Sequence, residues 1–325
     1  MAQEFIPIPV ATLLANTIPD FALYLAKPDY DARFVLYRQE GHYLTREHLR
    51  RLKLHGVERL YIKAEDRPLQ QRYMVQTARQ LVADPKRPSR EKAETIYEFG
   101  KSAVQHALEE PCEASIKTCR DLAQEQVRYV VGDPHAVPNF LRIISHDYYT
   151  YTHSVNVCSF TVALCRQAGM TDIEQLKLVG IGAMLHDVGK SRIDRAILNK
   201  PGRLTPLERE RIKKHPELGV AMLAETSPVP PEATEIVLCH HEKCDGSGYP
   251  RGLSKDQLSL PSRACCIADI FDALTTHRSY KSAYAGFRAL LIMQQDMKTQ
   301  LDQELLTDLI RLVGQASKMA SRLAA

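Results

Sequence analysis

The sequence predicts a mainly α-helical protein with an all-helical C-terminal domain, a helical connector and a small N-terminal α/β domain. Three observations support this fold class. Short strand-type segments occur within residues 1–67. Residues 68–135 form helix-type stretches separated by breaks that contain proline or glycine. Residues 136–325 show apolar patterns typical of helices joined by short loops, with the glycine-rich segment Asp245–Gly252 as the main exception.

The N-terminal domain is expected to contain three strands and one helix. The strand candidates are Phe21–Ala26, Arg33–Tyr37 and Arg59–Lys63. Thr45 is a suitable N-cap for a helix that ends at Gly56, with Leu49 and Leu52 facing inward. We find no catalytic constellation here, and expect a sensor, docking or assembly domain. Three histidines of this domain are better explained as solvated side chains than as a metal cluster: His42, His48 and His55.

The helical connector is expected to break at Asp84–Ser89, at Pro111 and at Gly132–Pro134. Its helices would pack on the C-terminal domain or form a dimer interface.

Composition and charge set limits on the partners of the chain. With 43 basic and 39 acidic residues, the net charge of +4 is too small to indicate nucleic-acid binding. Apolar stretches such as Val179–Leu185 are too short to span a bilayer, and the start MAQEFIPIPV lacks the features of a secretory signal. The eight cysteines include no CxxC pair. We therefore expect a cytoplasmic protein with reduced thiols, no membrane insertion and no nucleic-acid polymer as partner.

An adjacent histidine and aspartate, His186 and Asp187, follow an apolar helix. On a helix their side chains would project about 100° apart, so both can reach a site between them. A carboxylate can bridge two cations, which makes the pair suitable for a dimetal centre. Lys190 would share the face of His186 if the helix continued, and there it would neutralise a phosphate oxygen or hold a nucleophile. Taken alone, the pair is better explained as a hydrogen-bonded histidine and an ordinary charge.

Further potential ligands make the ordinary explanation less suitable. They are His153, His215, His240, His241 and Asp269, and several of them follow apolar segments. Burying so many ionisable groups together is unfavourable unless something compensates. Metal coordination would keep the carboxylates ionised and the imidazoles neutral. Mixed nitrogen and oxygen ligands suit iron, manganese, zinc or nickel without selecting among them.

Two motifs make a more specific case. They read His186-Asp187-Val188-Gly189-Lys190 and His240-His241-Glu242-Lys243-Cys244-Asp245-Gly246-Ser247-Gly248-Tyr249-Pro250. With the segments Leu198–Thr205 and Ala268–Thr275, they resemble the HD-GYP family of bacterial phosphodiesterases over roughly residues 140–315. The resemblance implies an HD-type helical domain that hydrolyses the bacterial second messenger cyclic di-GMP to pGpG and often on to GMP.

The resemblance also implies a two-metal site, with iron or manganese favoured over zinc or nickel. One cation would be held by His153, His186 and Asp269, the other by His215, His240 and His241, with Asp187 bridging the two. Tyr149 stands where members with a third metal carry a glutamate, so we expect two cations. Two cations lower the pKa of a bridging water and clamp the phosphate. Asp187 and Lys190 are the expected catalytic residues.

Substrate contacts implied by the resemblance involve Lys190, Tyr249, Arg278 and Lys281. Tyr249 precedes a proline, which favours an extended backbone from which its ring or hydroxyl would meet the nucleotide. Gly-Tyr-Pro alone would be a surface turn, and the two basic residues near position 280 would alone be a solvated loop. Asp272 would either orient a metal ligand or have a structural helix role.

Two positions depart from the usual family pattern: Lys243 replaces a common arginine, and Ser279 replaces a proline. Neither is a metal ligand. Three hypotheses follow: an active cyclic di-GMP phosphodiesterase, a signalling protein that binds cyclic di-GMP or docks a partner with negligible turnover, and an HD-type phosphohydrolase for another nucleotide. Homodimerisation or docking to other signalling proteins is compatible with all three.

Overall fold

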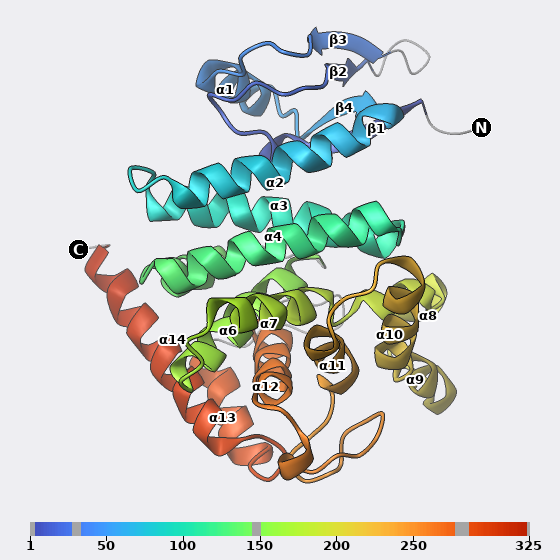
Figure 1. The fold of residues 1–325 in the computed structure, drawn as a ribbon, viewed down its shortest axis with the longest axis vertical. Helices are drawn as coiled ribbons and strands as arrows, with labels where there is room; N and C mark the ends of the chain where they lie inside the picture. The colour runs from blue at the N-terminus through green and yellow to red at the C-terminus, as the bar shows by residue number, and fades with distance from the viewer. Residues whose placement is uncertain (1–3, 28–33, 145–150, 277–285, 324–325) are drawn as a thin grey trace. The chain divides into compact units, whose positions relative to one another are not determined.

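The computed structural model describes residues 4–27, 34–144, 151–276 and 286–323, and it is predominantly helical, as the sequence predicts (Figure 1). The chain divides into two compact units, Met1–Arg87 and Pro88–Ala325. No helix among the described residues is long and apolar enough to cross a membrane.

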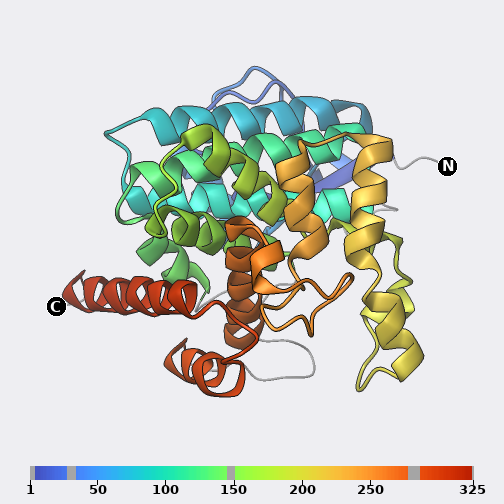
Figure 2. The ribbon, with the colours of Figure 1, turned by 60° about the horizontal axis from the view of Figure 1, so that its bottom comes forward.

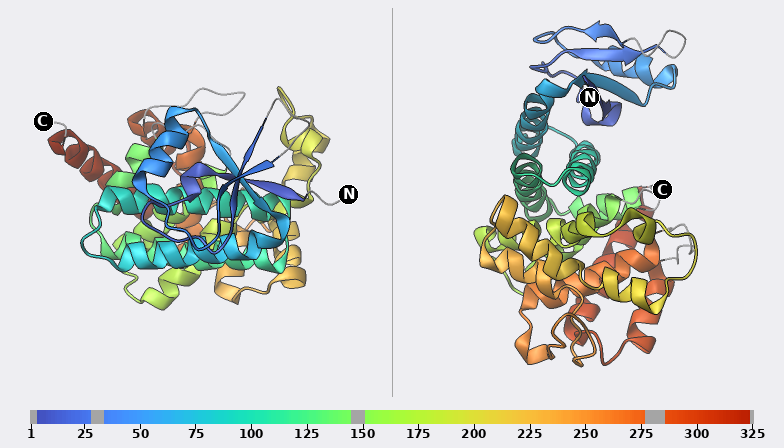
Figure 3. Two further views of the ribbon diagram at one scale, coloured as in Figure 1. Left: turned by 90° about the horizontal axis from the view of Figure 1, so that it is seen from above. Right: turned by 90° about the vertical axis from the view of Figure 1, so that its right-hand side faces the viewer.

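The first unit contains a four-stranded antiparallel sheet (Figure 3). Its spatial order is β1 (Phe5–Pro9), β4 (Arg59–Lys63), β2 (Leu23–Ala26) and β3 (Phe34–Arg38). The three predicted strands are present, and β1 is one that the sequence reading missed. Pro7 and Pro9 cannot donate to a neighbouring strand, and they are tolerated because β1 lies at the edge of the sheet.

Two helices complete the first unit. Helix α1 (Arg46–Leu54) begins after Thr45, whose hydroxyl accepts the His48 amide at 3.3 Å, and it ends before Gly56, which has a φ of 67°. Helix α2 (Arg67–Ala83) belongs to the same compact unit, since the hydroxyl of its Tyr73 accepts the Leu14 amide at 2.9 Å. The division of the chain into functional parts at residues 67 and 135 stays a prediction.

The second unit is entirely helical in its described residues. Its helices are α3 (Ser89–Glu109), α4 (Glu113–Gly132), α5 (Ala136–Ile144), α6 (Thr152–Gln167), α7 (Ile173–Leu185), α8 (Arg195–Leu198), α9 (Pro206–Ile212), α10 (His215–Thr226), α11 (Pro231–Cys239), α12 (Leu260–Thr275), α13 (Gly286–Asp296) and α14 (Gln303–Leu323). The breaks from α2 to α5 fall at the three predicted segments. Short 3-10 turns cover Val188–Arg192 and Lys255–Gln257.

Helices α6, α7 and α12 form the core of the second unit. Helix α6 packs along both α7 and α12 and is buried almost along its whole length. The rings of Phe160 on α6 and Phe271 on α12 meet edge to face at 5.3 Å. Figure 2 shows α13 and α14, in red, beside the orange helix α12. This packing brings the first turn of α6 and the middle of α12 close to the end of α7.

Candidate metal centre

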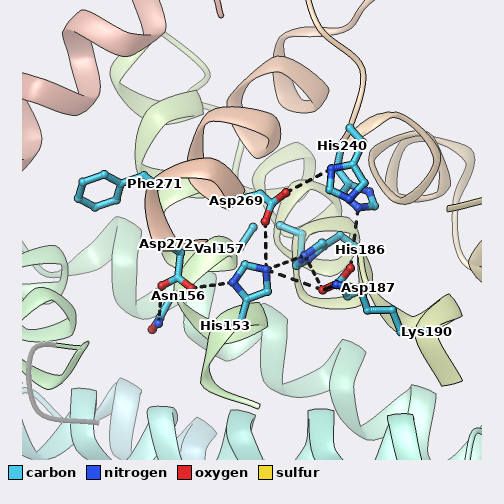
Figure 4. Close-up of polar contacts among 12 residues, drawn as sticks. His153, Asn156, Val157, His186, Asp187, Lys190, His240, Asp269, Phe271 and Asp272 are labelled. Carbon is cyan, nitrogen blue, oxygen red and sulfur yellow. Dashed lines mark hydrogen bonds and ion pairs between the residues drawn. The ribbon is translucent and has the colours of Figure 1, made fainter. Parts of the chain in front are cut away.

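Most of the potential ligands lie at helix ends around the core, and Asp269 lies within a helix. His186 and His240 directly follow α7 and α11, while His215 is the first residue of α10. His153 lies in the first turn of α6, and Asp269 lies in the middle of α12. Figure 4 shows the side chains of His153, His186, His240, Asp187 and Asp269 pointing toward one another. Each of these side chains therefore lies on a helix of the second unit or just after one.

The seven potential ligands form two adjacent groups. One contains Asp187, His215, His240 and His241, and the other contains His153, His186 and Asp269. Within each group the ligand atoms lie within 4.8 Å of one another. Asp187 links the groups, because its Oδ1 is 3.2 Å from Nε2 of His215 and its Oδ2 is 3.4 Å from Nε2 of His186. The two groups correspond to the two sets of ligands that the family resemblance implies, with Asp187 between them.

Backbone carbonyls orient three of the imidazoles. The Nδ1 atoms of His186, His215 and His240 lie 2.8–2.9 Å from the carbonyl oxygens of Ala183, Ile212 and Val237, each three residues earlier in the chain. A carbonyl oxygen can accept a hydrogen bond only from an N–H group, so these contacts place the proton of each neutral ring on Nδ1. The Nε2 atom of each ring then carries a lone pair. The Nε2 lone pairs therefore face the centre between the two groups.

The donor set fits divalent cations. Nε2 of His215 and Nε2 of His240 are 3.1 Å apart, although each ring carries its proton on the opposite side. Two lone pairs at this distance repel each other unless a cation lies between them. Oδ1 of Asp187 is buried without a hydrogen-bond partner among the described residues, which leaves it ready to coordinate.

The electrostatics of the group around Asp187 keep His240 and His241 neutral and Asp187 ionised. Burial lowers the pKa of His241 to about 3, and burial together with the neighbouring histidines holds the pKa of His240 well below its usual value. Burial opposes ionisation of Asp187, but the ammonium of Lys190 outweighs it and holds the Asp187 pKa well below the usual range. Neutral imidazoles beside an ionised carboxylate are the protonation states that metal binding requires.

Lys190 reaches the site by a route that differs from the expected one. Helix α7 ends at Leu185, so Lys190 does not share a helical face with His186. It lies instead in the following 3-10 turn and donates from Nζ to Oδ2 of Asp187 at 2.6 Å. The Lys190 side chain is 32% exposed, so its ammonium borders both the site and solvent.

The Gly-Tyr-Pro segment lies against the same site. The ring of Tyr249 lies 4.7 Å from that of His241, and the Tyr249 amide donates to the His241 carbonyl at 3.3 Å. The sequence reading missed Lys213, whose Nζ lies 5.8 Å from the centre of the Tyr249 ring. The only signal in the sequence for a basic side chain near Tyr249 was the pair of lysines that precedes His215.

Some predicted residues lie outside the described ranges: Tyr149, Arg278, Ser279 and Lys281. Among the described residues, both groups of potential metal ligands lie in the second unit. None includes a histidine of the first unit, where Nδ1 of His48 accepts the Thr45 amide at 3.0 Å in a capping box.

Comparison with known proteins now adds to this geometry. An HD domain family model matches residues 141–305, just over half of the 325-residue chain. A cyclic di-GMP phosphodiesterase of Pseudomonas aeruginosa, PA4108, is 36% identical over 194 residues, which cover 60% of this chain and 46% of that protein. The 3′3′-cGAMP-specific phosphodiesterase 3 of Vibrio cholerae is 39% identical over 156 residues, which cover 48% of this chain and 34% of that protein. The chain thus spans less than half the length of these relatives.

A solved structure agrees in fold over nearly the whole chain. Bd1817, an HDG"Y"P protein from Bdellovibrio bacteriovorus, superposes with a TM-score of 0.72 and covers 95% of this chain and 99% of its own. Its identity of 23% establishes a shared fold and no more. The chain belongs to the HD domain family, and its two motifs place it in the HD-GYP group.

Proposed function

We propose that this protein is a metal-dependent phosphodiesterase that hydrolyses cyclic di-GMP to pGpG, with hydrolysis of pGpG to GMP as a second step that the assay below tests. The observation that carries the proposal is the pair of adjacent donor groups linked by Asp187. Two divalent cations, iron or manganese in preference to zinc or nickel, would supply Lewis-acid charge and a water of lowered pKa. No Ser or Cys nucleophile is needed for such a reaction.

The residues of the chain would divide the work as follows. His153, His186 and Asp269 would hold one cation, and His215, His240 and His241 the other, with Asp187 between them. Lys190 would hold Asp187 ionised and meet a non-bridging oxygen of the scissile phosphate, because its ammonium borders both. Tyr249 would offer its ring to a guanine base beside His241. Arg278 and Lys281 would contact a phosphate of the ligand, as the family resemblance implies.

The choice of substrate rests on the relatives. The similar proteins of Pseudomonas aeruginosa and Thermotoga maritima, the latter 38% identical over 137 residues, are cyclic di-GMP phosphodiesterases. The Vibrio cholerae relative, which is specific for 3′3′-cGAMP, makes that mixed dinucleotide the second candidate substrate.

The test is an anaerobic assay of protein loaded with Fe²⁺ or Mn²⁺, with cyclic di-GMP, 3′3′-cGAMP and pGpG as substrates and the products identified. We expect cyclic di-GMP to be linearised, and a His186→Ala, Asp187→Ala double variant to lose this activity. His106→Ala with Glu110→Ala removes a histidine–carboxylate pair at the end of α3 and is the matched control, which should keep the activity. Undiminished hydrolysis by the site variant would contradict the proposal.

Two outcomes would support alternatives. Tight binding of cyclic di-GMP without product under both metal loadings would identify a binding or docking protein. Faster hydrolysis of 3′3′-cGAMP than of cyclic di-GMP would identify the mixed dinucleotide as substrate.

A further inference from the structure

One imidazole of the centre is oriented differently from the others. His186, His215 and His240 each lean on a backbone carbonyl three residues earlier. His153 lies in the first turn of α6. Its Nδ1 instead lies 2.6 Å from Oδ2 of Asp272, on α12 (Figure 4). The orientation of His153 therefore depends on contact between two helices.

Asp272 is itself held in a fixed orientation. Its side chain is fully buried, and its second oxygen, Oδ1, accepts Nδ2 of Asn156 at 2.7 Å. Asn156 is also buried, and its Oδ1 has no hydrogen-bond partner among the described residues. A carboxylate only accepts hydrogen bonds, so the amide must present its nitrogen to Asp272. With both oxygens occupied, Asp272 cannot rotate away from His153 without losing two buried bonds.

The spacing along the two helices produces this arrangement. His153 and Asn156 are three residues apart on α6, as Asp269 and Asp272 are on α12, so each pair shares one helical face. The first member of each pair faces the other at the centre, with Nε2 of His153 3.1 Å from Oδ1 of Asp269. The second members meet one turn further away and support the first.

We propose that Asp272, held by Asn156, is the positioning residue that sets the ring orientation and the Nδ1–H tautomer of His153, and that only the cation held by His153, His186 and Asp269 depends on it. The inference rests on the proposed metal centre. A carboxylate behind a metal-binding imidazole typically affects metal affinity about 10–100-fold. In the other group, backbone carbonyls orient His215 and His240, Lys190 holds Asp187, and His241 lies against the Tyr249 ring. None of these contacts involves Asp272, so we expect its removal to leave the affinity of that group unchanged.

The test compares Asp272→Ala, Asp272→Asn and Asn156→Ala with the wild type. Asp302→Asn is the matched control, because Asp302 is equally buried on the same unit but pairs with Lys255 and Arg263. Binding of Mn²⁺ is followed by anaerobic calorimetry with metal analysis. In Asp272→Ala we expect one cation to bind about 10–100-fold more weakly and the other as in the wild type. Asp272→Asn and Asn156→Ala should show smaller losses, and Asp302→Asn should bind both cations normally.

Two further readouts identify the affected site. In Zn²⁺-loaded protein, nitrogen NMR of the imidazoles should show the Nδ1–H form of His153 in the wild type and a mixture of tautomers in Asp272→Ala. In a His153→Ala background, Asp272→Ala should weaken metal binding no further. Equal weakening of both cations, or lowered stability with both cations bound normally, would make Asp272 a structural tie between α6 and α12 and overturn the proposal. If Asp272→Ala does not fold, Asp272→Asn and Asn156→Ala decide by the same measurements. A wild type that binds two cations without hydrolysing a cyclic dinucleotide would contradict the proposed function and leave this inference standing.

Discussion

At the scale of single residues, the glycine of the His-Asp-x-Gly-Lys motif has a steric cause. A Cβ atom at Gly189 would lie 2.0 Å from the carbonyl oxygen of His215 and 2.4 Å from the amide nitrogen of Gly219. Both are backbone atoms of α10, so movement of a flexible side chain cannot relieve the clash. Gly189 therefore lets the turn after Asp187 pack directly on α10. This packing places Oδ1 of Asp187 3.2 Å from Nε2 of His215.

Gly189→Ala should consequently damage both stability and metal binding. Overpacking of this kind costs about 1–3 kcal/mol in the free energy of unfolding, and displacement of α10 should weaken the cation held by His215. Gly132→Ala is the control, because a Cβ there would meet nothing within 4 Å. Urea unfolding and metal analysis of both variants check the prediction. Wild-type stability and full metal content in Gly189→Ala would show that α10 yields without cost.

The sequence predicted the residue types of the centre better than the contacts behind them. His186-Asp187 and His240-His241 are recognisable because ionisable side chains follow apolar runs, and the family resemblance supplied their division between two cations. Asn156 could not be found in this way, because its partner Asp272 lies 116 residues further along the chain. Only the packing of α6 on α12 brings the two together.

At the scale of elements, the Gly-Tyr-Pro loop is organised around a buried carboxylate. Glu242 is 1% exposed and accepts the backbone amides of Arg251 at 2.7 Å and Leu253 at 3.0 Å. A Cβ at Gly248 would lie 2.5 Å from the Cα of Glu242, so the Gly248 backbone lies very close to the start of the loop. The glutamate after the two histidines thus closes the loop that carries Tyr249.

Glu242→Ala should loosen this loop without removing a metal ligand. Two part-buried backbone amides would lose their acceptor, and each lost hydrogen bond costs about 0.5–1.5 kcal/mol. We expect faster hydrogen exchange at Arg251 and Leu253 and weaker nucleotide binding, with both cations retained. Asp245→Ala, which removes an exposed carboxylate bonded to the Ser247 amide in the same loop, should leave exchange at both positions unchanged. Unaltered exchange in Glu242→Ala would show that the loop is held by other contacts.

The elements also show where local patterns fail. Helices α2, α3 and α4 end at proline- or glycine-containing segments, which are local signals that the sequence displays. Strand β1 was missed because its two prolines argue against a strand, while its pairing partner Lys63 lies 58 positions after Phe5. A strand defined by a distant partner cannot be recognised from its own residues.

At the scale of the whole molecule, α3 and α4 are part of the compact unit that contains the centre. A Cβ at Gly180 of α7 would lie 2.3 Å from Val127 of α4, so these two helices are in very close contact. Gln126 of α4 is fully buried and donates to the Val155 carbonyl and the Ser159 hydroxyl on α6, both at 2.7 Å. No local pattern in residues 68–135 distinguishes such core helices from a connector, since the difference lies in what they pack against.

The division at residue 88 predicts which fragment of the chain carries the metal centre. A fragment of residues 88–325 keeps the contacts of α4 with α6 and α7, so we expect it to fold and to bind two cations. A fragment of residues 136–325 would expose the apolar faces of α6 and α7 and leave Gly180 without Val127, so it should unfold at lower temperature and bind fewer cations. Circular dichroism melting and metal analysis of the two fragments test this directly. Equal melting temperatures and metal contents would show that residues 136–325 form a self-sufficient domain and that α3 and α4 are a connector after all.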